Sequence, residues 1–313
     1  MASDDTKSSY TDILNSYIKS LIENVDHSNI PSEIDVVFDG GAFNGIIEQG
    51  IAMYLQIMEN TGKLKVRRVS GCSIGAFVAL VYVSNKLFDF EDSFTRVARR
   101  LKDKHDLLEC AHSARRFIFE QLSDTDIEGL NDVLHITYYD MELSQQIVVQ
   151  RFDSREHLYE CIMRSTHLPF LSNSEMKYKG RYVDGLTPHI FRDGKRNVLF
   201  VSTLTRKKIS RVLMNSNESN CSSRLIAGVA DADEFFSRGS SDLCSWVNDW
   251  SFYHFYFMRI REFVCFFIIW TLNALVIIPY NLPSSIKQSY VYHGLVKCCA
   301  GIYSDVLYCL IKI

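Results

Sequence analysis

Apolar and polar positions follow two different periods along the chain, and the period changes at turn residues. Residues 10–25 carry apolar side chains at helical spacing, and residues 34–38 form a short β-branched run that is typical of a buried strand. A helical pattern at 46–60, a strand-like run at 65–70 and an almost wholly apolar helical run at 74–86 follow. Strands that alternate with helices predict an α/β fold with a mainly parallel sheet.

The same two patterns continue to about residue 205. Helical spacing returns at 89–104, 107–122 and 154–165, and β-rich runs occur at 133–138, 146–152 and 197–202. The runs at 133–138 and 146–152 are close in sequence and predict two paired strands. The pattern divides the chain into three predicted regions, which are a helical lead-in at 1–31, an α/β domain at 32–205 and a C-terminal region at 206–313.

A serine lies between two glycines where the second predicted strand meets the apolar helix. The sequence Gly71-Cys72-Ser73-Ile74-Gly75 has the form G-x-S-x-G, which is typical of a nucleophile elbow. Side chains at Gly71 and Gly75 are expected to clash with the neighbouring helix and strand, because the turn is sharp and strained. Strand-to-helix corners without catalytic function carry the same pattern, so the rest of the chain must decide between the two interpretations.

A glycine-rich loop, Asp39-Gly40-Gly41-Ala42-Phe43-Asn44-Gly45, follows the first predicted strand. Its spacing matches neither a P-loop nor a dinucleotide fingerprint, so an oxyanion is favoured over a phosphate as its ligand. A right-handed parallel crossover places this loop beside the serine turn. The N–H groups of Gly41, Ala42 and Ile74 are then expected to converge on a carbonyl oxygen, although a plain tight turn is the alternative.

A serine nucleophile needs a base within hydrogen-bond reach. Asp184 directly follows a short β-rich run, and Gly185 allows the chain to turn and leave the carboxylate at the strand end. A carboxylate that is shielded from water has a raised pKa and can serve as the base. The alternative is a histidine-dependent α/β-hydrolase that uses His189 or His254.

The glycine loop, the serine elbow and the Asp-Gly pair, in this order, resemble the patatin-like phospholipase family. Residues 165–169, Ser-Thr-His-Leu-Pro, also resemble the small-residue block of that family, and the resemblance covers residues 34–202. It implies a three-layer fold in which helices flank a mainly parallel central sheet. By position, it implies that Ser73 is the nucleophile and Asp184 the base of a dyad without histidine, with Gly40, Gly41 and Ala42 in the oxyanion loop.

The resemblance implies a lipid acyl hydrolase of the phospholipase A or lysophospholipase type that works through an acyl-enzyme, without a metal or cofactor. Ala42 stands where many members have a third glycine, and Asn44 where many have Arg or Lys. These departures motivate one alternative, a catalytically weak or inactive lipid-binding protein of the same fold. A lipase that acts on acylglycerols is another alternative.

The C-terminal region contains an uncharged apolar run that ends at Pro279. A helix over 263–279 is slightly short for a bilayer core of about 30 Å, so a spanning helix, a helix that dips into one leaflet and a buried core helix stay open. Arg259 and Arg261 precede the run and would place a cytosol-facing catalytic domain at the membrane. Residues 291–313 predict a second, amphipathic helix.

Composition narrows the possible partners. The net charge of −3 gives no basic field for nucleic acid, so a lipid and a membrane surface are the expected partners. The nine cysteines are too scattered for a disulfide framework or a zinc site, which favours a reducing compartment. The polar, acidic N-terminus is not typical of a secretory signal, and no pattern indicates an oligomeric state.

Overall fold

The computed structural model describes residues 2–173, 175–204, 221–298 and 301. The β-branched runs form one mixed sheet with the strand order β4-β3-β2-β1-β6-β7, and β5 pairs with β3. The strands are β1 Glu33–Phe38, β2 Lys65–Cys72, β3 Leu134–Asp140, β4 Gln145–Val149, β5 Tyr182–Val183, β6 Asn197–Val201 and β7 Cys244–Trp246. The predicted pairing of 133–138 with 146–152 is confirmed as the antiparallel pair β3–β4.

The sheet is less uniformly parallel than expected. β1 pairs in parallel with β2 and β6, and β2 pairs in parallel with β3. The short strands β4, β5 and β7 are antiparallel to their neighbours. A short turn joins β3 to β4, whereas the crossovers from β1 to β2 and from β2 to β3 contain helices.

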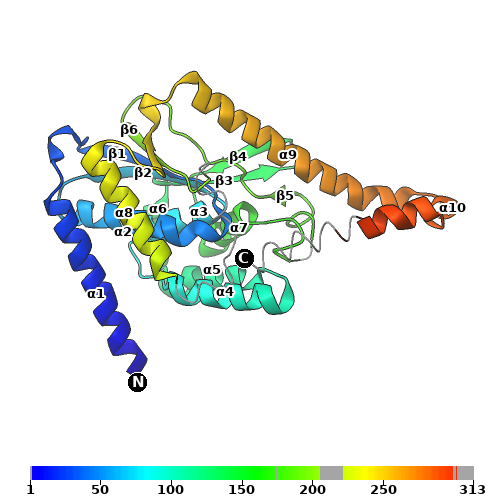
Figure 1. The fold of residues 1–313 in the computed structure, drawn as a ribbon, viewed down its shortest axis with the longest axis horizontal. Coiled ribbons are helices and arrows are strands. Elements are labelled where there is room, and N and C mark those ends of the chain that lie inside the picture. The colour runs from blue at the N-terminus through cyan, green and yellow to red at the C-terminus, as the bar shows by residue number, and fades with distance from the viewer. Residues whose placement is uncertain (1, 174, 205–220, 299–300, 302–313) are drawn as a thin grey trace.

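The helices are α1 Ala2–Glu23, α2 Gly45–Asn60, α3 Ile74–Ser84, α4 Phe90–Lys104, α5 Leu108–Arg116, α6 Asp124–Leu130, α7 Arg155–Ser165, α8 Ser222–Arg238, α9 Phe252–Asn281 and α10 Ser284–Lys287 (Figure 1). A π-helical turn, Phe117–Gln121, extends α5. α1 begins well before the predicted start at residue 10.

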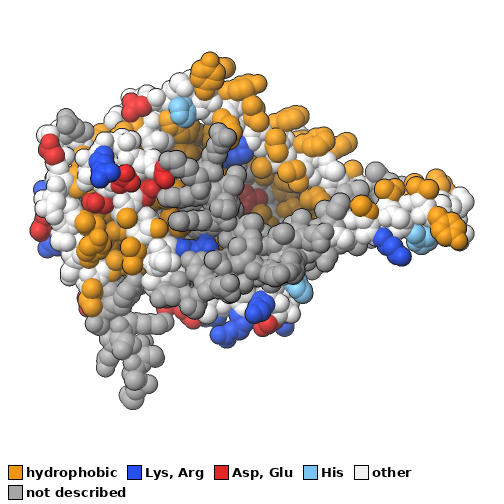
Figure 2. Space-filling model, in the orientation of Figure 1, with side chains coloured by type: hydrophobic (Ala, Val, Ile, Leu, Met, Phe, Trp, Pro, Cys, Tyr) orange, Lys and Arg blue, Asp and Glu red, His pale blue; other side chains and the backbone are white. Residues whose placement is uncertain are grey.

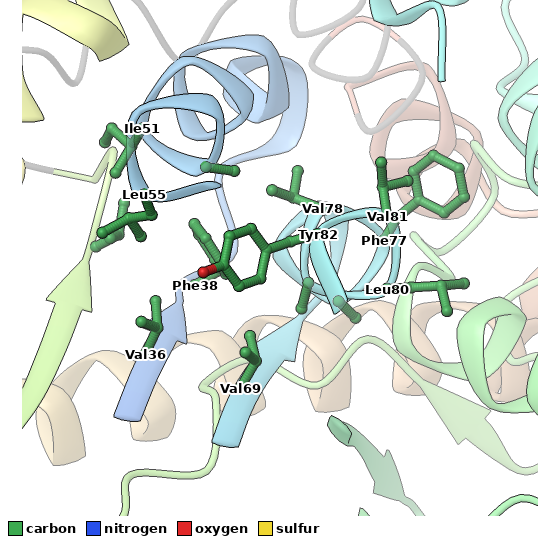
Figure 3. Packing of buried hydrophobic residues seen from close by; sticks show 14 of the residues in the cluster. Val36, Phe38, Ile51, Leu55, Val69, Phe77, Val78, Leu80, Val81 and Tyr82 are labelled. Carbon is green, nitrogen blue, oxygen red and sulfur yellow. The ribbon is translucent and has the colours of Figure 1, made fainter. Parts of the chain in front are cut away.

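The two faces of β1 contact different helices. Val36 and Phe38 belong to the main core with Ile51 of α2 and Val78 of α3, and Figure 3 shows their side chains pointing toward these helices. Val37 points the opposite way, into a second cluster that includes Phe255 and Met258 of α9. Because successive side chains of a strand alternate between its faces, the sheet is covered on both sides, and the predicted layered α/β architecture is confirmed.

The predicted segment 263–279 lies within α9 and is helical. Among the described residues, no helix is both long enough and apolar enough to cross a membrane. A transmembrane helix is therefore not supported. Of the second predicted segment, residues 291–298 and 301 are helical, and the rest lies outside the described residues, as does the predicted boundary at 205/206.

Candidate active site

Ser73 occupies a strained turn between β2 and α3. Its backbone has φ 53° and ψ −133°, a conformation that non-glycine residues rarely adopt. A Cβ on Gly71 would lie 2.4 Å from the carbonyl oxygen of Gly75, and a Cβ on Gly75 would lie 2.3 Å from the carbonyl oxygen of Asp39. Both glycines of the G-x-S-x-G pattern are therefore required by backbone contacts, as the sequence predicts.

Ser165, at the end of α7, fixes this turn from the side. The Ser73 N–H donates to Ser165 Oγ at 3.0 Å, and Ser165 Oγ donates to the carbonyl oxygen of Thr137 at 2.6 Å. In the sequence, the family resemblance is the one signal for the block 165–169, and it implies no function for Ser165. The structure shows that this fully buried hydroxyl connects the serine turn to β3.

The same block positions Asp184 beyond the end of β5. The Asp184 N–H donates to the carbonyl oxygen of His167 at 3.1 Å, and the Gly185 N–H donates to that of Ser165 at 3.4 Å. A Cβ on Gly185 would lie 2.4 Å from the carbonyl oxygen of Thr137, so only glycine fits this turn. Residues 165–167 thereby hold the serine turn and the aspartate turn side by side.

The Asp184 carboxyl is buried, with 7 % of the residue exposed. Burial raises the pKa of Asp184 to about 6, while the Ser73 hydroxyl and the Leu186 N–H lower it as hydrogen-bond donors. Leu186 N–H donates to Oδ1 at 3.0 Å, whereas Oδ2 has no partner at regular hydrogen-bond geometry among the described residues. The contact with Ser73 is therefore looser than a regular hydrogen bond, and the carboxylate keeps an acceptor site toward the serine.

The glycine loop packs against the serine turn. A Cβ on Gly40 would lie 3.2 Å from Ser73 Cβ, and a Cβ on Gly45 would lie 2.4 Å from Ile74 Cγ1. The Gly40 N–H donates to Asp39 Oδ1 at 2.8 Å and is thus already engaged. Of the predicted loop donors, Gly41 and Ala42 remain as candidates beside Ile74.

Two arginines from outside the loop contact it, and no pattern in the sequence predicts either contact. Arg224 of α8 is buried and donates from Nη1 to Asn44 Oδ1 at 3.0 Å and to the Phe43 carbonyl oxygen at 3.3 Å. A guanidinium thus lies beside the position where many family members have a basic residue. Arg261 of α9 forms an ion pair with Asp39, a contact that the predicted place of Arg261 beside a membrane segment did not include.

An apolar cavity borders the serine turn. Ile74 and Thr166 form part of its wall, together with Phe43, Phe77, Phe94 and Val97. Its wall is formed mostly by hydrocarbon and aromatic side chains, which suits a fatty-acyl chain.

The candidate histidines are engaged elsewhere. His189 stacks on His135 with ring centroids 5.8 Å apart, and burial lowers its pKa. His254 stacks on Trp250 and contacts the Ser251 hydroxyl through Nδ1. Within the described residues, no group of three or more His, Cys, Asp or Glu side chains is arranged to hold a metal ion.

Comparison with known proteins agrees with this arrangement. Residues 36–187 match the family model described as patatin-like phospholipase. The chain contains a patatin-like phospholipase domain. A comparison with curated protein sequences gives no match. The patatin-like domain includes both Ser73 and Asp184, and it points to a lipid acyl hydrolase, whereas Arg224 and Arg261 lie outside the matched stretch.

Proposed function

We propose that this protein hydrolyses fatty-acyl esters of lipids with Ser73 as the nucleophile and Asp184 as the general base. The observation that carries the proposal is the pairing of a serine on a strained elbow with a buried carboxyl whose pKa is about 6. Such a carboxylate is ionised at neutral pH and still basic enough to accept a proton as the serine attacks. The phospholipase A or lysophospholipase reaction is the favoured subtype.

In the proposed reaction, Asp184 takes the proton of the Ser73 hydroxyl as Oγ attacks the ester carbonyl. The N–H groups of Gly41, Ala42 and Ile74 stabilise the oxyanion of the tetrahedral intermediate. The intermediate expels the alcohol, which receives its proton from Asp184, and leaves an acyl-enzyme on Ser73. Water, deprotonated by Asp184, then releases the fatty acid and restores the serine.

The local surroundings support a dyad over a histidine-dependent triad. Asp184 lies close enough to Ser73 for the serine hydroxyl to lower its pKa, while His189 and His254 are engaged in other aromatic clusters. The apolar cavity beside Ile74 supports an acyl chain as the substrate group that lies next to the serine.

We also propose that the protein binds a membrane surface on the cytosolic side. Apolar side chains gather along one side of α9, as Figure 2 shows, and Tyr253, Phe257, Phe263 and Phe267 are exposed there at helical spacing. An apolar helix face of this kind suits the boundary between lipid headgroups and acyl chains. The scattered cysteines support the cytosolic assignment.

Hydrolysis assays with phospholipid, lysophospholipid and acylglycerol substrates test the proposal. Both Ser73→Ala and Asp184→Asn are expected to lower the rate by about 10³-fold or more, whereas His189→Ala and His254→Ala retain activity. Ser84→Ala, at the far end of the helix that follows Ser73, is the matched control. Turnover that is unchanged in Ser73→Ala would contradict the assignment, and absent turnover with retained lipid binding would favour the lipid-binding alternative.

A further inference from the structure

An ion pair between Arg261 and Asp39 connects α9 to the glycine loop. Arg261 Nη1 and Nη2 donate to the two carboxylate oxygens of Asp39 at 2.5 and 2.8 Å. The Asp39 side chain is fully buried, and that of Arg261 is 15 % exposed. A bidentate contact of this kind fixes the orientation of the two side chains as well as the distance between them.

Asp39 is itself fixed to the centre of the sheet. Its N–H donates to the carbonyl oxygen of Val201 in β6, and its Oδ2 accepts from Ser202 Oγ at 2.8 Å. Its Oδ1 accepts the Gly40 N–H, which orients the first peptide of the glycine loop next to Ser73. The Asp39 carboxylate therefore fixes the glycine loop relative to β1 and β6.

Arg261 also contacts the aspartate turn. Its Nη2 donates to the carbonyl oxygen of Leu186 at 3.4 Å, and the N–H of the same residue donates to Asp184 Oδ1. Leu186 adopts a positive φ of 58°, which is unusual for leucine and shows that the turn is held by its surroundings. One guanidinium thus bridges the glycine loop and the turn that carries Asp184.

The rest of α9 holds Arg261 in place. Met258 packs in the second cluster on one side of it, and Ile269 packs against Met176 and Val183 on the other. The exposed apolar residues lie on the outward side of the same helix. Arg261 thus lies between the apolar contacts that hold the inward side of α9.

The charges of this pair act on Asp184 in opposite directions. Asp39 raises the pKa of Asp184 and Arg261 lowers it. The other titratable groups near this site are the thiols of Cys72 and Cys265 and the buried Glu48, whose pKa is raised well above its usual range by burial and by Asp39. The charges that act on Asp184 are those of Asp39 and Arg261, so the electrostatic balance at Asp184 depends on this pair.

We propose that Arg261 is a positioning residue of the active site, which aligns the glycine loop with the Asp184 turn and makes α9 part of the catalytic unit. The proposal rests on the Ser73–Asp184 chemistry proposed above. It extends the functional unit beyond residues 36–187, because Arg261 lies 74 positions past the end of the matched stretch.

The test compares pH–rate profiles of the full chain on a soluble short-chain ester, p-nitrophenyl butyrate, so that membrane binding does not enter the readout. The variants are Arg261→Met, Arg261→Lys, Asp39→Asn and the double variant Asp39→Asn/Arg261→Met. Arg259→Met is the matched control, because Arg259 lies on the same helix, is exposed and pairs only with Glu262 among the described contacts. Thermal unfolding monitored by circular dichroism shows which variants are folded.

Arg261→Met is expected to lower kcat at least tenfold and to move the acid limb of the profile to higher pH, because it leaves the Asp39 carboxylate buried without its partner. Arg261→Lys keeps the charge, so the limb stays near its wild-type position while kcat falls. The double variant removes both charges, returns the limb toward wild type and recovers activity relative to Arg261→Met. Arg259→Met matches wild type.

Two results would overturn the proposal. One is an Arg261→Met variant with wild-type kcat and acid limb. The other is a loss of activity in every variant in proportion to the unfolded fraction, with no movement of the limb in Arg261→Met. Turnover that persists in Ser73→Ala would instead contradict the proposed function, so the two failures are distinguishable.

Discussion

Helices α3 and α9 are both rich in apolar residues, yet they lie in different surroundings. Residues 75–82 of α3 are all buried between the sheet and its neighbouring helices. α9 buries one side against the sheet and exposes large apolar side chains, including Phe263, Phe267 and Trp270, on the other. Apolar content thus predicts a helix in both cases, but only the packing shows which side chains are removed from water.

The largest expected difference between the two helices is in stability. Phe77 of α3 is 6 % exposed and packs edge-on against Phe88 and Phe117, whereas Phe267 of α9 is 57 % exposed. Phe77→Ala is expected to lower the free energy of unfolding by about 3–5 kcal/mol. Phe267→Ala is expected to change it by less than about 0.5 kcal/mol, as measured by urea denaturation. Equal losses would show that the outward side of α9 is covered in solution.

The next effect concerns Asp184, which lies between the turn before α3 and Arg261 of α9. Burial raises its pKa from 3.8 to about 6, so in that pH range the folded protein holds a proton that the unfolded chain has released. The protonated Asp184 carboxyl therefore contributes fully to the free energy of unfolding below about pH 4, and this contribution is lost as the pH rises through about 6. At pH 7, Asp184→Asn is expected to raise the free energy of unfolding by up to about 3 kcal/mol while it abolishes turnover.

Urea denaturation at pH 4 and pH 7 checks this prediction. The gain should vanish at pH 4, where the wild-type carboxyl is protonated. The wild-type rate should fall on the acid side at about pH 6, because turnover needs the ionised carboxylate. A gain of the same size at both pH values would show that the pKa of Asp184 is not raised.

A smaller loss is expected at the start of α3. Gly75→Ala places a Cβ 2.3 Å from the Asp39 carbonyl oxygen and should cost about 1–3 kcal/mol of unfolding free energy, with a loss of activity. The matched control is Gly129→Ala in α6, where an added Cβ has no neighbour within 4 Å. That control should be neutral or stabilising by up to about 1 kcal/mol. Equal effects at both glycines would contradict close packing between β1 and α3.

The smallest effect tests the exposed side of α9. The double variant Phe263→Ser/Phe267→Ser should weaken binding to phosphatidylcholine vesicles about tenfold or more, because it removes two large apolar groups from the bound surface. Leu87→Ser, at an 85 % exposed position in the loop before α4, is the control and should bind as wild type. Vesicle co-sedimentation measures both, and unchanged binding in the double variant would contradict a membrane-binding side on α9.

Sequence patterns predicted most of the central fold because their signals are local. The predicted strand at 34–38 matches β1, and the predicted helix at 46–60 matches α2, each within one or two residues. The antiparallel edge strand β7 was not predicted, because three residues are too few to show a period.

The residues of the predicted site lie in short sequence motifs, whereas the residues that hold them in place come from distant parts of the chain. Ser73, Asp184 and the glycine loop each lie in a short motif, and the structure brings them together. Ser165 had only the family resemblance as a signal. Arg224 and Arg261 had none, because each contacts the loop from a helix about 180 or more positions away in sequence.

The sequence by itself determined the β–loop–α units, the strained serine turn and the order of the motifs, since glycine positions and side-chain periods act over a few residues. The tertiary structure decided that an arginine in an apolar C-terminal segment lies against a buried carboxylate. Desolvation makes the difference. A buried charge such as Asp39 is stable only with a partner at the right distance, and which segment supplies that partner is settled only when the chain is folded.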